Sequence, residues 1–158
     1  MKRIDKIIAH PTFITTIKEL KAREATRKYC IHDMEHLLNV ARIMMIKNLE
    51  EHLNFEKELI YASAILHDIG KLSQYKTKEK HALIGSEIAH SILLECNFTA
   101  EETKMITQAI KTHSDNEPTN PLGELLRDCD KLSRNCFICS ASNECKWSKK
   151  EKNRGITI

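Results

Sequence analysis

The sequence predicts an all-α fold, and three observations support this prediction. Only four Gly and three Pro occur among the 158 residues, well below the ~12% that average usage would give. Apolar residues recur at intervals of three and four in several segments, which is the spacing of amphipathic helices. No segment alternates apolar and polar residues as a half-buried strand would. At this length we expect one domain that buries a substantial core.

We expect six helices, the first from about residue 12 to residue 29. The second covers residues 34–49 and carries apolar residues at helical spacing. The third begins near Asn54, a favourable N-cap, and residues 59–66 are apolar on nearly every side. This third helix should therefore be the central buried helix, and Gly70 is its expected stop signal.

Three further helices are expected in the second half of the chain. Residues 71–80 contain four lysines and predict a surface loop. The order Thr99-Ala100-Glu101-Glu102 has the spacing of a capping box, so a helix should start there and run through Thr112. The other helices are expected over residues 82–94 and 122–132, with a loop at residues 116–121.

The composition excludes several function classes. The glycines are too far apart for a phosphate-binding loop or a dinucleotide fingerprint, and no G-x-S-x-G nucleophile elbow is present. The N-terminus lacks the apolar stretch of a secretory signal, and the longest apolar segment, residues 59–66, is far below the ~20 residues that span a bilayer. We therefore expect a soluble cytoplasmic protein with no membrane partner, whose six cysteines stay mostly reduced.

Six ionisable side chains lie, by spacing, on the apolar faces of the expected helices. A single buried His is commonly just a hydrogen-bonded core residue, but a buried ionised carboxylate is costly without a partner. Two Asp and four His that converge in a helical bundle are best stabilised by a divalent cation. Mixed His and carboxylate ligands suit Mn, Fe, Ni or Zn better than Ca. The six residues are His36, His67, Asp68, His81, His113 and Asp130.

Three segments carry a family resemblance. Residues 32–41, with the sequence HDMEHLLNVA, resemble the first-His motif of the HD-domain phosphohydrolase superfamily. Residues 64–71, AILHDIGK, resemble its naming His-Asp motif, and residues 128–132, DCDKL, resemble its closing Asp motif. The order and the spacing of the three motifs agree with the superfamily over about residues 30–133.

The resemblance implies a compact bundle of helices that holds a divalent metal. The implied ligands are His36, His67, Asp68 and Asp130. It also implies hydrolysis of phosphomonoesters or phosphodiesters, often of nucleotides, by a water that the metal activates. His32, at the start of the first motif, is then expected to be an exposed residue at the beginning of its helix.

Residues 81–89, HALIGSEIA, resemble the H-x-x-x-G segment of superfamily members that hold two metals. These members include diadenosine tetraphosphate hydrolases and cyclic-dinucleotide phosphodiesterases. The resemblance implies that His81 and His113 bind a second ion and that Asp68 bridges both ions. Ser114 stands where several relatives have a second His, so the second site would have one ligand fewer. One ion is therefore expected, and a second is the alternative.

We expect a metal-dependent phosphohydrolase that acts on a nucleotide or a related small phosphate ester. Asp68 is the expected catalytic residue, and Lys71 and Lys131 lie beside the motifs, where they could neutralise phosphate charge. The alternative for both lysines is a solvated helix end, and Arg42 and Arg134 are weaker candidates of the same kind. Two other functions stay open, namely a non-catalytic sensor that holds metal and nucleotide, and nucleic-acid binding through a basic tail.

The end of the chain differs in composition from the rest. We divide the chain into an HD-type domain, residues 1–135, and a Cys-rich basic tail, residues 136–158. From Lys131 onward seven basic and two acidic residues give a net charge of +5, although the whole chain has only +3. The tail has few aromatic residues for stacking on bases, which makes nucleic acid the less favoured partner.

The tail cysteines suggest a second metal site. C-x2-C spacing lets two thiolates reach one metal, and a third thiolate follows after a short loop, so zinc or an iron–sulfur cluster is a hypothesis. Reduced thiols without a ligand are the alternative, because Cys129 would lie ~10 Å from the first tail cysteine on a continuous helix. The tail site would comprise Cys136, Cys139 and Cys145. Cys30 and Cys96 are expected in the core, and Trp147 should pack the tail onto the body.

Overall fold

The computed structural model describes residues 1–115 and 120–156. Within these ranges the chain forms eight α-helices and two short 3-10 helices, with no strand, which confirms the all-α prediction. The α-helices are α1 (Lys2–Ala9), α2 (Pro11–Glu24), α3 (Met34–Glu50), α4 (Lys57–Leu66), α5 (Lys71–Thr77), α6 (His81–Glu95), α7 (Ala100–Thr112) and α8 (Pro121–Leu132). The 3-10 helices are η1 (Cys136–Ile138) and η2 (Ser142–Glu144).

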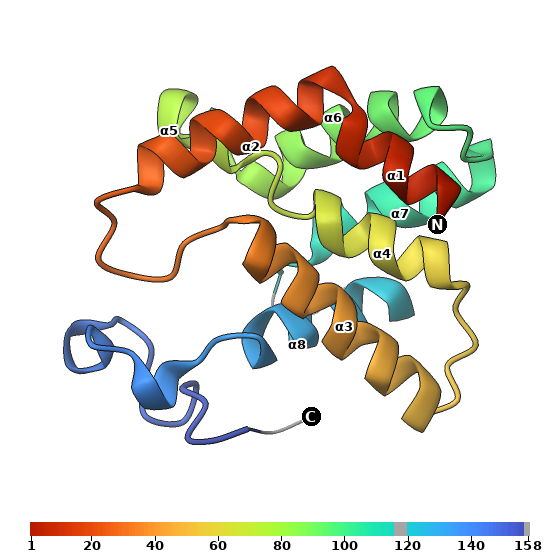
Figure 1. Cartoon of the computed structure of the whole chain (residues 1–158). Coiled ribbons are helices and arrows are strands. Elements are labelled where there is room, and N and C mark those ends of the chain that lie inside the picture. The colour runs from red at the N-terminus through yellow and green to blue at the C-terminus, as the bar shows by residue number, and fades with distance from the viewer. Residues whose placement is uncertain (116–119, 157–158) are drawn as a thin grey trace.

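Helix α4 is the centre of the bundle, as predicted. It runs through the middle of the molecule and contacts α1, α3, α7 and α8 (Figure 1). From Leu59 to Leu66 every residue except Tyr61 is buried. One apolar cluster joins α4 to α1, α6 and α7, and a second joins it to α3, α7 and α8. The residues that directly follow α4 are therefore held in the interior by packing on both sides.

Two helix starts follow the local capping chemistry of the sequence. The capping box before α7 is formed, because Thr99 Oγ1 accepts from the Glu102 N–H at 3.2 Å and the Glu102 carboxylate accepts from the Thr99 N–H at 2.8 Å. Asp33 caps α3 by accepting from the His36 N–H at 3.0 Å. Both caps fix the first turn of a helix. Helix α3 carries His36, and His113 directly follows the last residue of α7.

Several predicted boundaries are wrong. The helix expected over residues 12–29 ends at Glu24 and is preceded by α1, whose buried Ile4 and Ile7 pack on the core. Asn54 has a positive φ of 61° and precedes the helix instead of capping it. Helix α5 lies within the expected loop at residues 71–80, because contacts with α2 and α6 stabilise a segment that has no apolar periodicity of its own. In the other expected loop, 116–121, residues 116–119 lie outside the described residues.

Gly70 has a different role from the predicted helix stop. Its φ of −77° is ordinary for any residue, so no left-handed conformation demands a glycine here. A Cβ at this position, however, would lie 2.0 Å from the carbonyl oxygen of His81 and 2.6 Å from the backbone nitrogen of Gly85. The absence of a side chain therefore lets the turn after α4 pack directly on the first turns of α6.

The tail is attached to the helical body by hydrogen bonds. The side-chain amide of Asn153 lies 2.8 Å from the carbonyl oxygens of Lys131 and Arg134 and 3.1 Å from that of Leu132. It thus satisfies carbonyls at the C-terminal end of α8, which have no partner within the helix. Lys28, in the segment between α2 and α3, forms an ion pair with Glu144 of the tail. The tail therefore lies against the end of α8.

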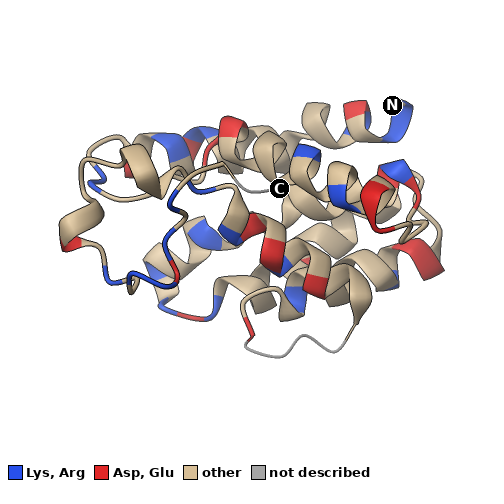
Figure 2. Ribbon diagram, turned by 90° about the horizontal axis from the view of Figure 1, so that it is seen from below, with Lys and Arg blue, Asp and Glu red and all other residues tan. Residues whose placement is uncertain are grey.

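The tail also differs from the body in charge. Figure 2 shows Lys and Arg positions gathered along the tail, whereas the helices carry both signs. Cys96 is buried as predicted, but Cys30 is exposed, so its assignment to the core is wrong. The segment between α2 and α3 is irregular, and its apolar residues have no helical face to join. No helix in the described part of the chain is both long and apolar enough to cross a membrane.

Candidate metal centre

The fold brings the six predicted ionisable side chains together around the turn that follows α4. Four imidazole rings form a continuous row, in which neighbouring ring centres are 5.2–5.4 Å apart. The residues come from α3 (His36), the turn after α4 (His67 and Asp68), the first residue of α6 (His81), the end of α7 (His113) and α8 (Asp130). Close contacts among these side chains exist only because five separate segments meet at this point.

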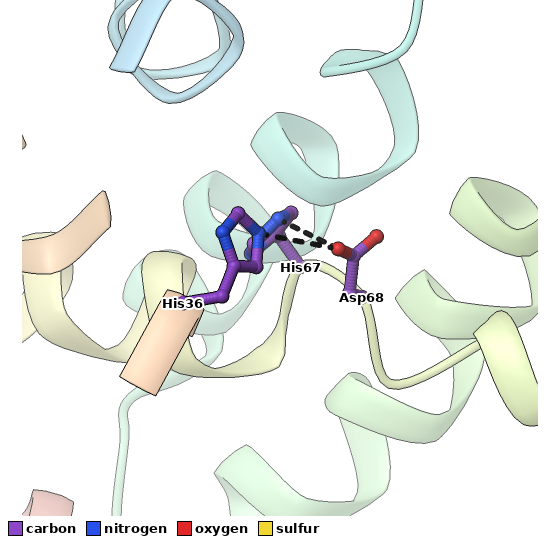
Figure 3. A group of neighbouring side chains, drawn as sticks. All are labelled: His36, His67 and Asp68. Atoms are coloured by element: carbon purple, nitrogen blue, oxygen red, sulfur yellow. Dashed lines mark ion pairs between the residues drawn. The ribbon is translucent and has the colours of Figure 1, made fainter. Parts of the chain in front are cut away.

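Asp68 divides the cluster into two groups. Figure 3 shows the imidazoles of His36 and His67 directed toward one carboxylate oxygen of Asp68. The distances from this oxygen, Oδ2, are 3.6 Å to His36 Nε2 and 3.1 Å to His67 Nε2. The other oxygen, Oδ1, lies 3.5 Å from His81 Nε2. Two sets of ligand atoms therefore share Asp68. One set includes His36 and His67, and the other includes His81 and His113. Within each set the ligand atoms lie within 4.8 Å of one another.

Asp130 lies beside the first of these groups. Its Oδ1 is 3.2 Å from His36 Nε2 and 3.8 Å from His67 Nε2. Burial alone would raise its pKa, but the neighbouring imidazoles of His36 and His67 and the charge of Arg134 hold that pKa well below its usual range. The first group thus contains two ionised carboxylates and two imidazoles.

The orientation of the histidines suits a cation. His67 Nδ1 donates to the carbonyl of Ala64 at 2.7 Å, and His113 Nδ1 donates to the carbonyl of Ile110 at 2.6 Å. Because a carbonyl only accepts, each ring uses Nδ1–H for this bond and turns Nε2 toward the interior of the cluster, where a neutral imidazole can bind a cation. Among the described residues, His67 Nε2 and Asp68 Oδ2 are buried without a hydrogen-bond partner. Buried polar atoms without partners are costly, so this set of ligand atoms fits a divalent ion.

The pKa shifts differ between the two groups. Burial would lower the pKa of His67, but the carboxylates of Asp68 and Asp130 raise it to about 10. The same negative field favours a metal cation at this place, and binding it would release the proton. In the second group, burial and the charge of Lys71 lower the pKa of His81 to about 3, and burial lowers the pKa of His113. These two imidazoles are therefore neutral near pH 7, as metal ligands must be.

His32 is a residue of the site that the sequence analysis missed. The expectation of an exposed helix start is wrong, because only 6% of its surface is exposed. Its Nδ1 lies 2.8 Å from Glu24 Oε1, its backbone N–H donates to Glu24 Oε2 at 2.7 Å, and its Nε2 is 3.9 Å from Asp68 Oδ2. Glu24 follows the buried Leu20 by four residues, so it continues the buried stripe of α2, and this charged residue on an apolar stripe was the available signal.

Glu24 makes the stability of the fold depend on pH. Burial would raise its pKa, but hydrogen bonds from His32 and Tyr75 lower it from 4.5 to about 2. A carboxylate with a depressed pKa stabilises the folded state above pH ~4.5, and this contribution is lost as the pH falls toward 2. The difference corresponds to on the order of 3 kcal/mol. We expect Glu24→Gln to lower the free energy of unfolding at pH 7 and to flatten its decrease between pH 5 and pH 3.

Urea unfolding of wild type and Glu24→Gln across this pH range checks the expectation. Glu19→Gln is the matched control, because Glu19 lies on the same helix with 49% of its side chain exposed. It should leave the shape of the stability curve unchanged. Parallel curves for Glu24→Gln and wild type would show that the buried carboxylate does not carry this pH dependence.

Of the basic side chains expected to neutralise phosphate charge, some lie at the cluster and others are exposed. Lys71 Nζ lies 3.8 Å from Asp68 Oδ1, on the side of the second group. Lys131 is exposed, and the cation that contacts Asp130 is Arg134, at 2.7 Å. Arg42 is exposed on the outer face of α3. Arg134, a weaker candidate from the sequence, is thus the arginine at the cluster.

None of the tail cysteines belongs to the two sets of ligand atoms that the described residues form around Asp68. All three are free and half-buried. Among the residues that the structure describes, the sets of ligand atoms close enough to share an ion are the two around Asp68. A zinc or iron–sulfur site at Cys136, Cys139 and Cys145 therefore stays a prediction.

An all-α bundle that buries a His-Asp pair among further His and Asp side chains is a helical domain with a candidate metal centre. Comparison with known proteins identifies its family. The model of the HD domain matches residues 33–135, and the chain therefore belongs to the HD-domain family. The matched range contains all six predicted ligands of the cluster.

Individual proteins and one solved structure are similar to this chain. An uncharacterized protein of Clostridium beijerinckii is 41% identical over 153 residues, which are 97% of each chain. Ribonuclease Y of Pelobacter propionicus is 29% identical over 124 residues, which are 78% of this chain but only 22% of that protein. A solved structure from an uncultured Thermotogales bacterium, described as a predicted HD superfamily hydrolase, has the same fold, with a TM-score of 0.67 and 22% identity over 89% of this chain and 79% of that one.

Proposed function

We propose that this protein hydrolyses a phosphomonoester or phosphodiester bond of a nucleotide or related small phosphate ester, with divalent metal bound at the cluster. The observation that carries the proposal is the division of Asp68 between two sets of ligand atoms. Such an arrangement suits one ion with His36, His67, Asp68 and Asp130 and a second ion with Asp68, His81 and His113. We therefore propose two ions, of Mn, Fe, Ni or Zn type, because the ligands combine imidazole and carboxylate.

Bound metal would supply a Lewis acid and a water of lowered pKa near neutral pH. The charges and the orientation of the side chains at the cluster suit this chemistry. Asp68 and Asp130 concentrate negative charge where cations bind, and Lys71 holds a positive charge beside Asp68 Oδ1, where it can neutralise a phosphate oxygen. Glu24 holds His32 so that its Nε2 faces the first group as an acceptor. No phosphate-binding loop is needed, because the metal and Lys71 carry that role.

A metal-dependent assay of the full chain tests the proposed function. Protein stripped with a chelator is supplied with Mn2+, Fe2+, Ni2+ or Zn2+ and offered nucleoside phosphates, dinucleoside polyphosphates, cyclic dinucleotides and a short oligoribonucleotide. The resemblance to ribonuclease Y is the reason for the oligoribonucleotide. We expect hydrolysis of at least one of these esters, dependent on added metal and lost when the chelator is restored.

A matched pair of histidine variants connects the activity to the cluster. His36→Gln should lower kcat/KM by at least ~100-fold, because a metal ligand is lost. His90→Gln, an exposed position on α6, should leave kcat/KM unchanged. A protein that binds metal at the cluster but hydrolyses no ester with any metal would instead be a non-catalytic sensor. Binding of the oligoribonucleotide that disappears on deletion of residues 136–158 would favour nucleic-acid binding by the tail.

A further inference from the structure

Arg134 lies at the end of α8 with its guanidinium against the first group of ligand atoms. Its side chain is 9% exposed. Nη2 lies 2.7 Å from Asp130 Oδ1 and 3.2 Å from His36 Nε2. Burial would lower its pKa, but the charges of Asp130 and Asp68 raise it, so the guanidinium is always charged. Both of its contacts are atoms that the proposed function assigns to an ion, and the following inference rests on that function.

The hydrogen bonds around His36 determine which of its nitrogens accepts. Ser133 Oγ donates to the carbonyl of Asp130 at 2.7 Å, so it is an acceptor toward His36 Nδ1 at 3.2 Å. The Nδ1–H of His36 therefore donates to Ser133, and its Nε2 carries a lone pair. Since a guanidinium can only donate, the contact between Arg134 and His36 Nε2 uses this lone pair.

The two partners of Arg134 respond differently to an ion. An imidazole Nε2 has one lone pair, so His36 cannot bind an ion and accept from Arg134 at the same time. Each carboxylate oxygen has two lone pairs, so Asp130 can bind an ion and still accept from the guanidinium. Ion binding at His36 thus releases one N–H of Arg134, while the ion pair with Asp130 keeps the guanidinium beside the bound ion.

We propose that Arg134 is a substrate-binding residue, which donates this released N–H to a phosphate oxygen of the substrate. Charge-assisted hydrogen bonds between guanidinium and phosphate are strong, and their geometry is specific. Lys71 lies beside the other oxygen of Asp68. Arg134 and Lys71 therefore place one positive charge beside each group of ligand atoms, which favours a substrate whose phosphoryl group spans both groups.

Two binding measurements on the full chain test this role, and they do not require a known substrate. Arg134→Met should bind Mn2+ about 10-fold more tightly, because a competitor for His36 and a like charge are removed. The same variant, loaded with Mn2+, should bind inorganic phosphate about 10- to 100-fold more weakly than wild type. Arg134→Lys keeps the charge but not the planar fork, so both of its affinities should lie between those of Arg134→Met and wild type.

Arg127→Met is the matched control. Arg127 lies on the same helix and pairs with Asp128, which is 49% exposed, so this change should alter neither affinity. Opposite changes in Mn2+ and phosphate affinity at Arg134 support the proposal. A parallel loss of both affinities in Arg134→Met, together with a lower Tm, would indicate a purely structural role and overturn the proposal. Unchanged phosphate affinity in this variant would also overturn it, and so would a wild type that binds no phosphate.

The outcome for Arg134 is distinguishable from the outcome for the proposed function. If phosphate binding depends on Arg134 but no ester is hydrolysed, the residue binds phosphoryl groups and the proposed hydrolysis is wrong. If an ester is hydrolysed and the KM of Arg134→Met equals that of wild type, the proposed hydrolysis stands and the role of Arg134 is wrong.

Discussion

Asp68→Asn is expected to abolish metal-dependent hydrolysis, with kcat/KM lowered by at least ~10^3-fold, or about 4 kcal/mol of transition-state stabilisation. The physical reason is that Asp68 presents one oxygen to each group of ligand atoms, so one substitution affects both ions. The amide of asparagine carries no charge and one oxygen, so it cannot serve both groups. The stoichiometry of bound Mn2+, measured by elemental analysis, should therefore fall below the two ions of the proposed site.

A second readout of Asp68→Asn does not depend on activity. In the metal-free protein the carboxylate of Asp68 contributes to the raised pKa of His67. Its removal should lower that pKa, which NMR titration of the imidazole would detect. Asp128→Asn is the matched control, because Asp128 lies on α8 with 49% of its side chain exposed, and it should change neither value. Full activity with two bound ions in Asp68→Asn would refute the bridging role.

Gly70→Ala should strongly destabilise the fold and also disrupt the second group of ligand atoms. The added Cβ would lie 2.0 Å from the carbonyl oxygen of His81, and both clashing partners are backbone atoms that cannot rotate away. Overpacking of this kind costs about 3 kcal/mol or more. Any relaxation must separate the turn that carries Asp68 and Gly70 from the start of α6, which carries His81. We expect a lower free energy of unfolding in urea and, in protein that still folds, loss of the ion at His81.

Two other glycines provide graded controls for this change. At Gly85 the nearest atom to an added Cβ would be the backbone nitrogen of Gly70 at 3.2 Å, so Gly85→Ala should cost less. At Gly155 no atom lies within 4 Å, so Gly155→Ala should have little effect. Equal stability of Gly70→Ala and Gly155→Ala would show that the close approach of the two backbones is not required.

Most of the site was predictable because its residues interrupt regular patterns. His67 and Asp68 directly follow a buried helix, and further His and Asp lie on apolar stripes. These residues stand out in the sequence because ionised groups at buried positions need a partner. The capping box at Thr99 was equally visible, since its hydrogen bonds join residues three apart. Local chemistry of this kind does not depend on the rest of the fold.

The residues that escaped prediction are those whose role depends on a distant partner. Glu24 and His32 form a buried pair across a segment without regular structure, and no spacing rule connects them. Helix α5 has no apolar stripe of its own and is stabilised by its neighbours. Arg134 was only a weak candidate, because the end of α8 had to be placed beside α3 before its contact with His36 could be recognised.

The sequence was sufficient to predict the helical class, the central helix and the six residues of the candidate metal centre. It did so because helix periodicity and the cost of burying charge act within one segment at a time. The sequence did not predict that the two oxygens of Asp68 face different histidines, that Arg134 rather than Lys131 contacts Asp130, or that Gly70 permits close packing of backbones. These features arise where segments far apart in the chain meet, and their geometry depends on the packing of the whole bundle.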